Sequence, residues 1–297
     1  MAQAIDVQAT TRISSAIGGW DQGASCLTAL AVAVDQDAAE PLRRAGREVM
    51  AAAGLGEALA ELEALAFSPA QLRGIAASPL LQGASLLNGS QDWGSLGDAV
   101  LSAQGEASGS AAALFAHVVL PHFPDLAERL ATPGARMLDV GTGIGALAIG
   151  FAQAFPQLQV TGIDVLPRAL ELARAGVQRS PAASRVEVRH LDVADLTEDA
   201  VYDLAWVPAP FVPQPALTAG IARIFTALRP GGLVMIGHGT FEGDDLPVAL
   251  TRFKTIAYGG TPLDAADAVA LLHTHGFGSV QLLPTPPGAP AITVGRR

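Results

Sequence analysis

The sequence predicts an α/β protein, in which a helical N-terminal region precedes a mostly parallel sheet that ends in an antiparallel hairpin. From residue 131 onward, short apolar segments typical of strands alternate with segments of helical periodicity, as in a parallel sheet covered on both faces. The last two strand-like segments, 279–283 and 291–294, are too close for a helical crossover, so we expect them to pair antiparallel. Two domains are expected, residues 1–107 and 108–297.

The first 130 residues are rich in Ala, Leu and Gly and carry apolar stripes at helical spacing. Ser68 followed by Pro69 has the pattern of a helix start, with Ser as the cap and Pro at the first helical position. Helices are predicted at 24–34, at 41–53, at 56–65, from 69 onward and at 108–119.

Residues 83–109 are interpreted as a loop-rich connection, because glycines recur along the whole segment. Such a connection either covers a ligand cleft as a lid or simply links two more regular parts of the chain. We prefer the first role and leave the second open.

The second part of the chain predicts the sheet and its covering helices in order. Strands are predicted at 137–140, 159–164, 185–193, 202–207 and 233–237, before the final hairpin. Helices are predicted at 146–155, 167–177, 217–228 and 261–275. The last of these helices is expected to start with a capping box at residues 261–264, with Pro262 at its first position.

The most informative stretch is Leu138-Asp139-Val140-Gly141-Thr142-Gly143-Ile144-Gly145, a strand that runs into a glycine turn and then a helix. This arrangement suits a nucleotide-like or anionic ligand. The turn also satisfies the dinucleotide fingerprint G-x-G-x-x-G/A, so a nicotinamide or flavin ligand remains open. The carboxylate of Asp139 would be poorly placed beside a pyrophosphate, because both are negative. It suits a cationic group, or it holds the turn through backbone N–H groups.

This stretch resembles motif I of the class I S-adenosylmethionine-dependent methyltransferases. The resemblance covers residues 125–297 and rests on five motifs in the right order. They are the glycine turn, the acids Asp164 and Asp192 after the second and third strands, the aromatic–proline segment 206–211, and Leu-Arg-Pro-Gly-Gly at 228–232. The resemblance implies the Rossmann-like methyltransferase sheet and S-adenosyl-L-methionine as the cofactor.

Further roles follow for the residues around the expected cofactor. Asp164 lies 23 residues after Gly141, where an acid can accept both ribose hydroxyls. The resemblance implies that Asp192 accepts the adenine amino group and that the backbone N–H of Val193 meets the ring. The candidate cofactor-binding residues are Asp139, Gly141, Thr142, Gly143, Gly145, Asp164, Val165, Asp192, Val193 and Pro208, with Gln104 at the methionine end.

The segment expected beside the methyl acceptor is Pro208-Ala209-Pro210-Phe211. Relatives that methylate planar amines carry Asn/Asp-Pro-Pro-Tyr/Phe here, so the missing Asn or Asp argues against adenine or glutamine-amide methylation. Stiff, apolar residues suit the wall of a hydrophobic acceptor site. A proton-accepting base is sought in His238, after the fifth strand, and secondly in His117. No spacing of His, Cys or acidic residues predicts a metal site.

Composition limits the partners. The net charge is −10, Lys254 is the only lysine and no basic run exists, so a nucleic-acid partner is not expected. The single Cys26 fits a reducing compartment. Neither a signal peptide nor a membrane span is predicted, so we expect a cytoplasmic protein without membrane contact. The helical part is expected to build the acceptor pocket, and it is also a candidate homodimer interface.

The sequence therefore predicts a methyltransferase that acts on a small apolar or aromatic metabolite, at oxygen or carbon, by in-line displacement. A nicotinamide-dependent oxidoreductase is the alternative, and Asp139 and the final hairpin argue against it. A protein that binds S-adenosylmethionine without methyl transfer is a third interpretation.

Overall fold

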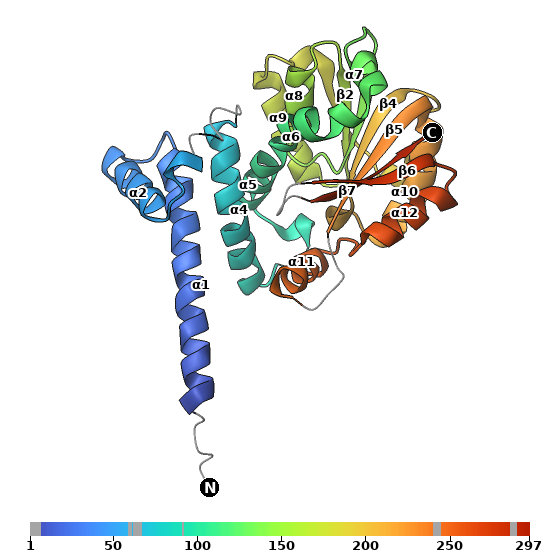
Figure 1. The fold of residues 1–297 in the computed structure, drawn as a ribbon. Helices are drawn as coiled ribbons and strands as arrows, with labels where there is room; N and C mark the ends of the chain where they lie inside the picture. The colour runs from blue at the N-terminus through green and yellow to red at the C-terminus, as the bar shows by residue number, and fades with distance from the viewer. Residues whose placement is uncertain (1–6, 59–60, 62–66, 91, 240–244, 286–289) are drawn as a thin grey trace.

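The computed structural model describes residues 7–58, 61, 67–90, 92–239, 245–285 and 290–297. It contains a layered α/β body with a group of N-terminal helices beside it (Figure 1). No helix within the described ranges combines the length and apolar character that a membrane span needs.

The sheet is built as predicted. The described chain forms a seven-stranded sheet in the order β3-β2-β1-β4-β5-β7-β6. The first five strands run parallel to their neighbours, whereas β7 is antiparallel to both β5 and β6. The strands are β1 Arg136–Val140, β2 Gln159–Asp164, β3 Val186–His190, β4 Tyr202–Pro208, β5 Leu228–His238, β6 Gly278–Leu283 and β7 Ala291–Arg296.

Helices cover both faces of the sheet, as the alternating pattern requires (Figure 1). Met137 and Phe151 belong to the core between one face and α7, α8 and α9. Leu138, the next residue along β1, belongs to the core under α10 and α12, because successive strand residues point to opposite faces. These helices are α7 Pro124–Leu130, α8 Ala146–Ala154, α9 Pro167–Arg179, α10 Gln214–Ala227 and α12 Ala265–Thr274.

The N-terminal helices pack on one another, and one of them joins the group to the sheet domain. The predicted start at Ser68 is confirmed by a reciprocal capping box, in which Ser68 Oγ accepts from Gln71 N and Gln71 Oε1 accepts from Ser68 N. The longest helix, α1, extends well beyond its neighbours (Figure 1). The helices are α1 Val7–Val34, α2 Glu40–Ala52, α4 Pro69–Leu87 and α5 Asp98–Gly109.

Shorter elements connect these parts. Instead of one helix over 108–119, the chain forms the end of α5, then α6, then a π-helical turn. The sequence did not predict α11. These elements are η1 Trp93–Ser95, α6 Ala111–Leu114, η2 Phe115–Val119, η3 Leu120–His122, η4 Ala183–Arg185, η5 Val193–Asp195, η6 Ala209–Phe211 and α11 Leu246–Ala257.

The prediction of a loop-rich connection over 83–109 is wrong, since the end of α4 and all of α5 lie within it. The glycines in this region allow close packing between elements rather than loop formation. A Cβ on Gly105 would come within 2.2 Å of Ile144, and a Cβ on Gly74 in α4 would come within 2.6 Å of the backbone nitrogen of Ala107. The missing side chains therefore allow helices to approach their neighbours closely.

Several element ends also differ from the prediction: α1 begins at Val7 rather than at residue 24, β5 begins at Leu228 rather than at residue 233, and two further ends are set by carboxylates. Residues 191–193 do not continue β3, because Asp192 caps the following turn by accepting from the backbone of Ala194. The last helix has no capping box at residues 261–264 and begins only at Ala265, after Asp264 as its cap. Each carboxylate accepts a hydrogen bond from a backbone N–H two or three residues further on, and so starts a new turn or helix at that point.

Two further predictions have a different outcome. The helix predicted at 56–65 lies mostly outside the described residues. The domain boundary at residue 107 falls inside α5, which packs against α4 and α8. The division into two domains therefore stays a prediction.

A pair of substitutions in α4 tests the packing of α4 on α5. Gly74→Ala is expected to lower the free energy of unfolding by about 1–3 kcal/mol, because the added Cβ meets the backbone of α5. Gly83→Ala is the matched control, because a Cβ there has no atom within 4 Å, and it should raise stability by about 0.5–1 kcal/mol. Urea denaturation measures both values. Stability changes of the same sign would contradict this account.

Candidate active site

The glycine turn between β1 and α8 has a backbone conformation that side chains resist. Gly141, Gly143 and Gly145 have φ values of +63°, +57° and +76°. Residues with a Cβ rarely adopt this left-handed region, so glycine is needed at all three positions.

The amide groups of this turn are already engaged within the protein. Gly143 N donates to Asp164 Oδ2 at 2.8 Å, and Thr142 N donates to the carbonyl of Ile163 at 3.0 Å. In a dinucleotide site, such amides point at the pyrophosphate. Here the Gly143 amide donates to the carboxylate of Asp164 instead, which disfavours a pyrophosphate at this amide.

Asp139 is the most deeply buried carboxylate of the turn, with 2% of its surface exposed. Its Oδ2 accepts from the hydroxyl of Thr142 at 2.6 Å, so a side chain rather than a backbone N–H joins Asp139 to the turn. Gly162, its register partner on β2, makes room, because a Cβ there would lie 2.5 Å from Thr142 Oγ1. Burial raises the pKa of Asp139 to about 7, against the lowering effect of the Thr142 hydrogen bond.

Asp164 ends β2 with both oxygens oriented. Oδ1 accepts from Leu166 N at 2.9 Å, while Oδ2 binds Gly143 N. Burial raises the pKa of Asp164, and these backbone hydrogen bonds oppose the rise. A carboxylate has about four lone-pair positions, so Asp164 can accept two further hydrogen bonds from a ligand.

The next strand end supplies an acid and an apolar surface. Asp192 is held by the backbone of Ala194, and Val193 is only 5% exposed. Gly220 on α10 leaves room for Val193, because a Cβ there would lie 2.6 Å from it. A flat ring can therefore lie against Val193 with Asp192 at its edge.

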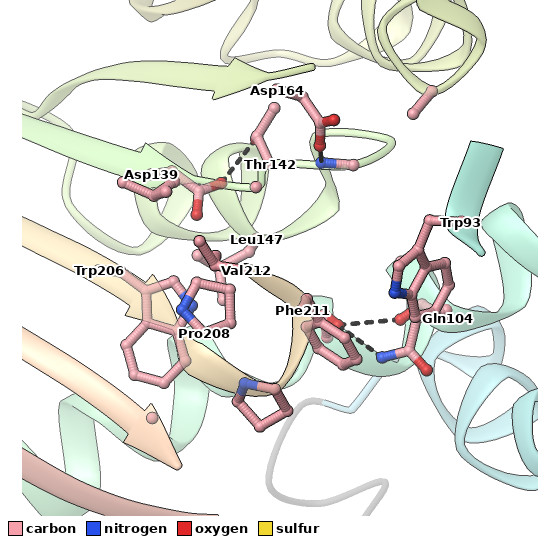
Figure 2. A pocket seen from close by; sticks show the side chains of 18 of the residues that line it. Trp93, Gln104, Asp139, Thr142, Leu147, Asp164, Trp206, Pro208, Phe211 and Val212 are labelled. Carbon is pink, nitrogen blue, oxygen red and sulfur yellow. Dashed lines mark hydrogen bonds between the residues drawn. The ribbon is translucent and has the colours of Figure 1, made fainter. Parts of the chain in front are cut away.

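A cavity of about 740 Å³ joins these groups at the carboxyl ends of the strands. Figure 2 shows its two regions, with Asp139, Thr142 and Asp164 on one side and Trp93 and Phe211 on the other. The ionisable side chains that line it, among the described residues, are Asp92, Asp139, Asp164, Asp192 and Tyr258. This lining suits a cationic ligand with hydroxyl groups and disfavours an anionic one.

The structure brings together almost all of the predicted cofactor residues. Those that line the cavity are Gln104, Asp139, Gly141, Thr142, Gly143, Asp164, Val165, Asp192, Val193 and Pro208. Gly145 stands behind the turn, where a Cβ would lie 3.3 Å from Ala173 of α9. Its role is to bring α8 close to α9.

The side chain of His238 does not line the cavity. Met235 and Gly237 line the cavity, and the next residue along β5 points the other way. His238 is 1% exposed, with Nδ1 3.0 Å from the carbonyl of Gly239 and Nε2 2.8 Å from the hydroxyl of Thr293. Burial lowers the pKa of His238.

The other predicted base also lies outside the cavity lining. His117 is exposed in the turn η2 and is not part of the cavity lining. The catalytic roles of both histidines therefore stay predictions. No group of His, Cys or acidic residues that could hold a metal ion occurs in the described part of the chain.

Sequence reasoning missed two aromatic side chains of the cavity. The ring centroids of Trp93 and Phe211 are 5.3 Å apart, and those of Trp93 and Tyr258 are 5.0 Å apart. The signal that could have indicated an aromatic region was Trp93 itself, a large aromatic residue among glycines and serines. Tyr258 follows α11, which no pattern predicted.

Asp139→Asn is expected to remove a pH dependence of stability. The raised pKa means that the folded state holds the Asp139 proton more tightly than the unfolded state does. Its contribution to stability is therefore complete below pH 3.8 and is lost as the pH rises through 7. Asn can still accept from Thr142 but does not ionise. As the pH rises from acid to alkaline buffer, the free energy of unfolding of the variant should therefore increase by roughly 1–4 kcal/mol relative to that of wild type.

Urea denaturation from about pH 5 to about pH 8 measures this difference. Asp195→Asn, at an exposed position, is the matched control and should leave the pH profile unchanged. Parallel profiles for wild type and Asp139→Asn would contradict the assigned burial.

Comparison with known proteins identifies the family. A family model described as a methyltransferase domain matches residues 137–232. The O-methyltransferase rstn1 of Aspergillus nomiae is 31% identical over 157 residues, which cover 52% of this chain and 69% of that protein. The release factor glutamine methyltransferase of Rhodopirellula baltica is 32% identical over 100 residues, or 33% of this chain and 34% of that protein. The chain thus spans about a third of that second relative.

One solved structure has the same fold over almost its whole length. It is the S-adenosylmethionine-dependent methyltransferase SibL in its apo form, with a TM-score of 0.61. The match covers 98% of this chain and 99% of SibL at 20% identity. Together with the extent of the rstn1 match, these findings remove the dinucleotide alternative: the chain belongs to the class I S-adenosylmethionine-dependent methyltransferases.

Proposed function

We propose that this protein transfers a methyl group from S-adenosylmethionine to oxygen or carbon of a small apolar or aromatic acceptor. The observation that carries the proposal is a single cavity that joins three buried or half-buried aspartates to an aromatic region. Such a cavity can place a cationic methyl donor and a flat acceptor side by side.

The aspartates match the chemistry of the methyl donor. S-adenosylmethionine supplies an electrophilic methyl group on a sulfonium when it is bound. Asp164 has free lone pairs for the ribose hydroxyls, and Asp192 stands where it can accept from the adenine amino group. Asp139 places negative charge near the methionine part, where ammonium and sulfonium need it.

The acceptor wall supports an apolar substrate. Pro208, Pro210 and Phe211 line the cavity directly after β4, with the indole of Trp206 beside them. Trp206 lies over β5 because Gly237 has no side chain: a Cβ there would come within 2.5 Å of the indole. The segment lacks the Asn or Asp expected for an amide acceptor, although one relative is named a glutamine methyltransferase. The name of rstn1 favours an oxygen acceptor.

In-line displacement makes two demands on this chain: alignment of the two reactants and exclusion of water. The prolines after β4 fix the backbone of the acceptor wall, and the apolar lining keeps water from the methyl group. We assign no proton-transfer step to His238 or His117, because neither lines the cavity. We also propose a cytoplasmic location, in agreement with the free Cys26.

Calorimetric titration tests the proposed cofactor. We expect S-adenosylmethionine and S-adenosylhomocysteine to bind and NAD(H) not to bind. Asp164→Ala should weaken binding at least about tenfold, because both the ribose contacts and the Gly143 hydrogen bond are lost. Asp195→Ala is the control: Asp195 is exposed and lies in η5, which follows β3, so this variant should bind as wild type does. Equal affinity of Asp164→Ala and wild type would refute the assigned site.

Methyl transfer itself is read by mass spectrometry. The protein is incubated with S-adenosylmethionine that carries a deuterated methyl group and with a panel of phenols, enols and amines. Label on an oxygen or carbon acceptor supports the proposal, whereas label on an amine alone overturns it. Cofactor binding without any labelled product would favour the third interpretation, binding without transfer.

We further propose that two copies associate through α1. Ile13, Ile17 and Trp20 form a stripe at helical spacing and are 53–65% exposed. All three belong to the N-terminal half of α1, and this half of the helix extends beyond the other helices (Figure 1). Pairing of two such stripes would remove a contiguous apolar surface from water.

Ile17→Glu is expected to convert a dimer into a monomer, because it puts a charge in the apolar stripe. Size-exclusion chromatography with light scattering measures the mass. Leu87→Glu is the control, since Leu87 is 91% exposed at the end of α4 and is not part of the apolar stripe of α1. A wild-type monomer, or a dimer that persists in Ile17→Glu, would exclude this interface.

A further inference from the structure

The indole of Trp93 carries a hydrogen-bond donor without a partner. Its Nε1 is shielded from solvent and has no acceptor within hydrogen-bond distance. In the described part of the chain, only the Oε2 of Glu106 is in the same situation. An unpaired buried donor is destabilising, and native proteins seldom leave one without a reason.

The position of Trp93 is fixed from both sides. Asp92 caps the turn η1 by accepting from the backbone of Ser95 at 2.8 Å. Tyr258, whose ring is tilted by 36° against that of Trp93, donates its hydroxyl to the carbonyl of Gln82 at 2.8 Å. These bonds connect η1, α4 and the end of α11 into one rigid wall.

Phe211 covers this wall from the cavity side. Its ring stands at 89° to that of Trp93, and the two side chains point toward one another in Figure 2. Phe211 is 39% exposed and lies in a turn next to Pro210. A flat molecule can therefore reach the indole by displacing one half-exposed ring.

Beside the aromatic wall lie a carboxylate, Asp92, and a network of neutral amide and hydroxyl groups around Gln104. The Oε1 of Gln104 accepts from Ser78 at 2.8 Å and from Gln82 at 2.7 Å, and Nε2 donates to Ser108 at 3.2 Å. This network leaves one N–H of Gln104 unassigned. The acids that line the cavity meet no lining Lys, Arg or His among the described residues, so nothing there compensates a negative charge on the acceptor.

We propose that Trp93 determines the specificity for the methyl acceptor, by donating its indole N–H to a carbonyl oxygen of a neutral, planar, aromatic molecule. The ring of that molecule lies against Trp93 and Tyr258 in place of Phe211. Anionic acceptors are excluded by the aspartates of the cavity. This inference rests on the proposed function, because it assigns the acceptor side of the same cavity.

Calorimetry with three related probes tests the inference. Chromone is neutral and has a ring carbonyl, chroman lacks the carbonyl, and chromone-2-carboxylate adds a negative charge. Each is titrated into protein saturated with S-adenosylhomocysteine. The variants are Trp93→Phe, which removes the N–H and keeps an aromatic ring, and Trp20→Phe, a control on α1 outside the cavity.

The expected results separate the donor from the ring. Trp93→Phe should bind chromone about tenfold more weakly than wild type, and it should bind chroman with unchanged affinity. Trp20→Phe should match wild type for both probes. Wild type should bind chromone-2-carboxylate at least about tenfold more weakly than chromone.

Three outcomes overturn the inference. They are equal loss of chromone and chroman affinity in Trp93→Phe, binding of the carboxylate as tight as that of chromone, and no binding of chromone at all. Binding of S-adenosylhomocysteine is measured first in every variant. If the cofactor product does not bind, the proposed function fails; if it binds and the probes behave otherwise, only this inference fails.

Discussion

Two hydrogen bonds at one edge of the sheet support the rest of the site. The Thr142 hydroxyl donates to Asp139, and the Gly143 amide donates to Asp164. Together they tie the turn after β1 to the end of β2 in a backbone conformation that glycine tolerates. The cavity wall, the start of α8 and the direction of both carboxylates depend on this connection.

The same connection changes the charge preference of a common type of fold. A glycine turn before a helix usually provides free amides for phosphate. Here the protein supplies its own anion, Asp164, and keeps a second carboxylate, Asp139, nearly without solvent. Buried negative charge is unfavourable until a positive partner arrives, so binding of a cation relieves an existing penalty.

Much of the sheet domain could be predicted from sequence, because its signals are local. Strand alternation, the glycine turn and the short link before β7 predicted the strands along the chain, their mostly parallel arrangement and the final antiparallel hairpin. Side-chain direction was harder. His238 follows a strand on the correct edge, but the two-residue period of β5 turns it toward Thr293.

The N-terminal half was predicted less well, because glycine is needed there for tertiary contacts rather than for loops. At Gly74 and Gly105 another helix or loop comes too close for a Cβ. In the sequence, a glycine that is needed for such close packing looks the same as a glycine that forms a loop. The aromatic region depends on the same kind of long-range contact. Trp93 meets Tyr258 only in the folded chain, so neither sequence neighbourhood announces a shared site.

The bond between Tyr258 and Gln82 joins residues 176 positions apart, and this separation has a consequence for biosynthesis. The N-terminal helices leave the ribosome long before the segment that completes their aromatic wall has been translated. Contacts of such high sequence separation form late and slow folding. A nascent chain released early would therefore carry the glycine turn in full while exposing the apolar side of α4 and η1, which makes premature termination a route to aggregation.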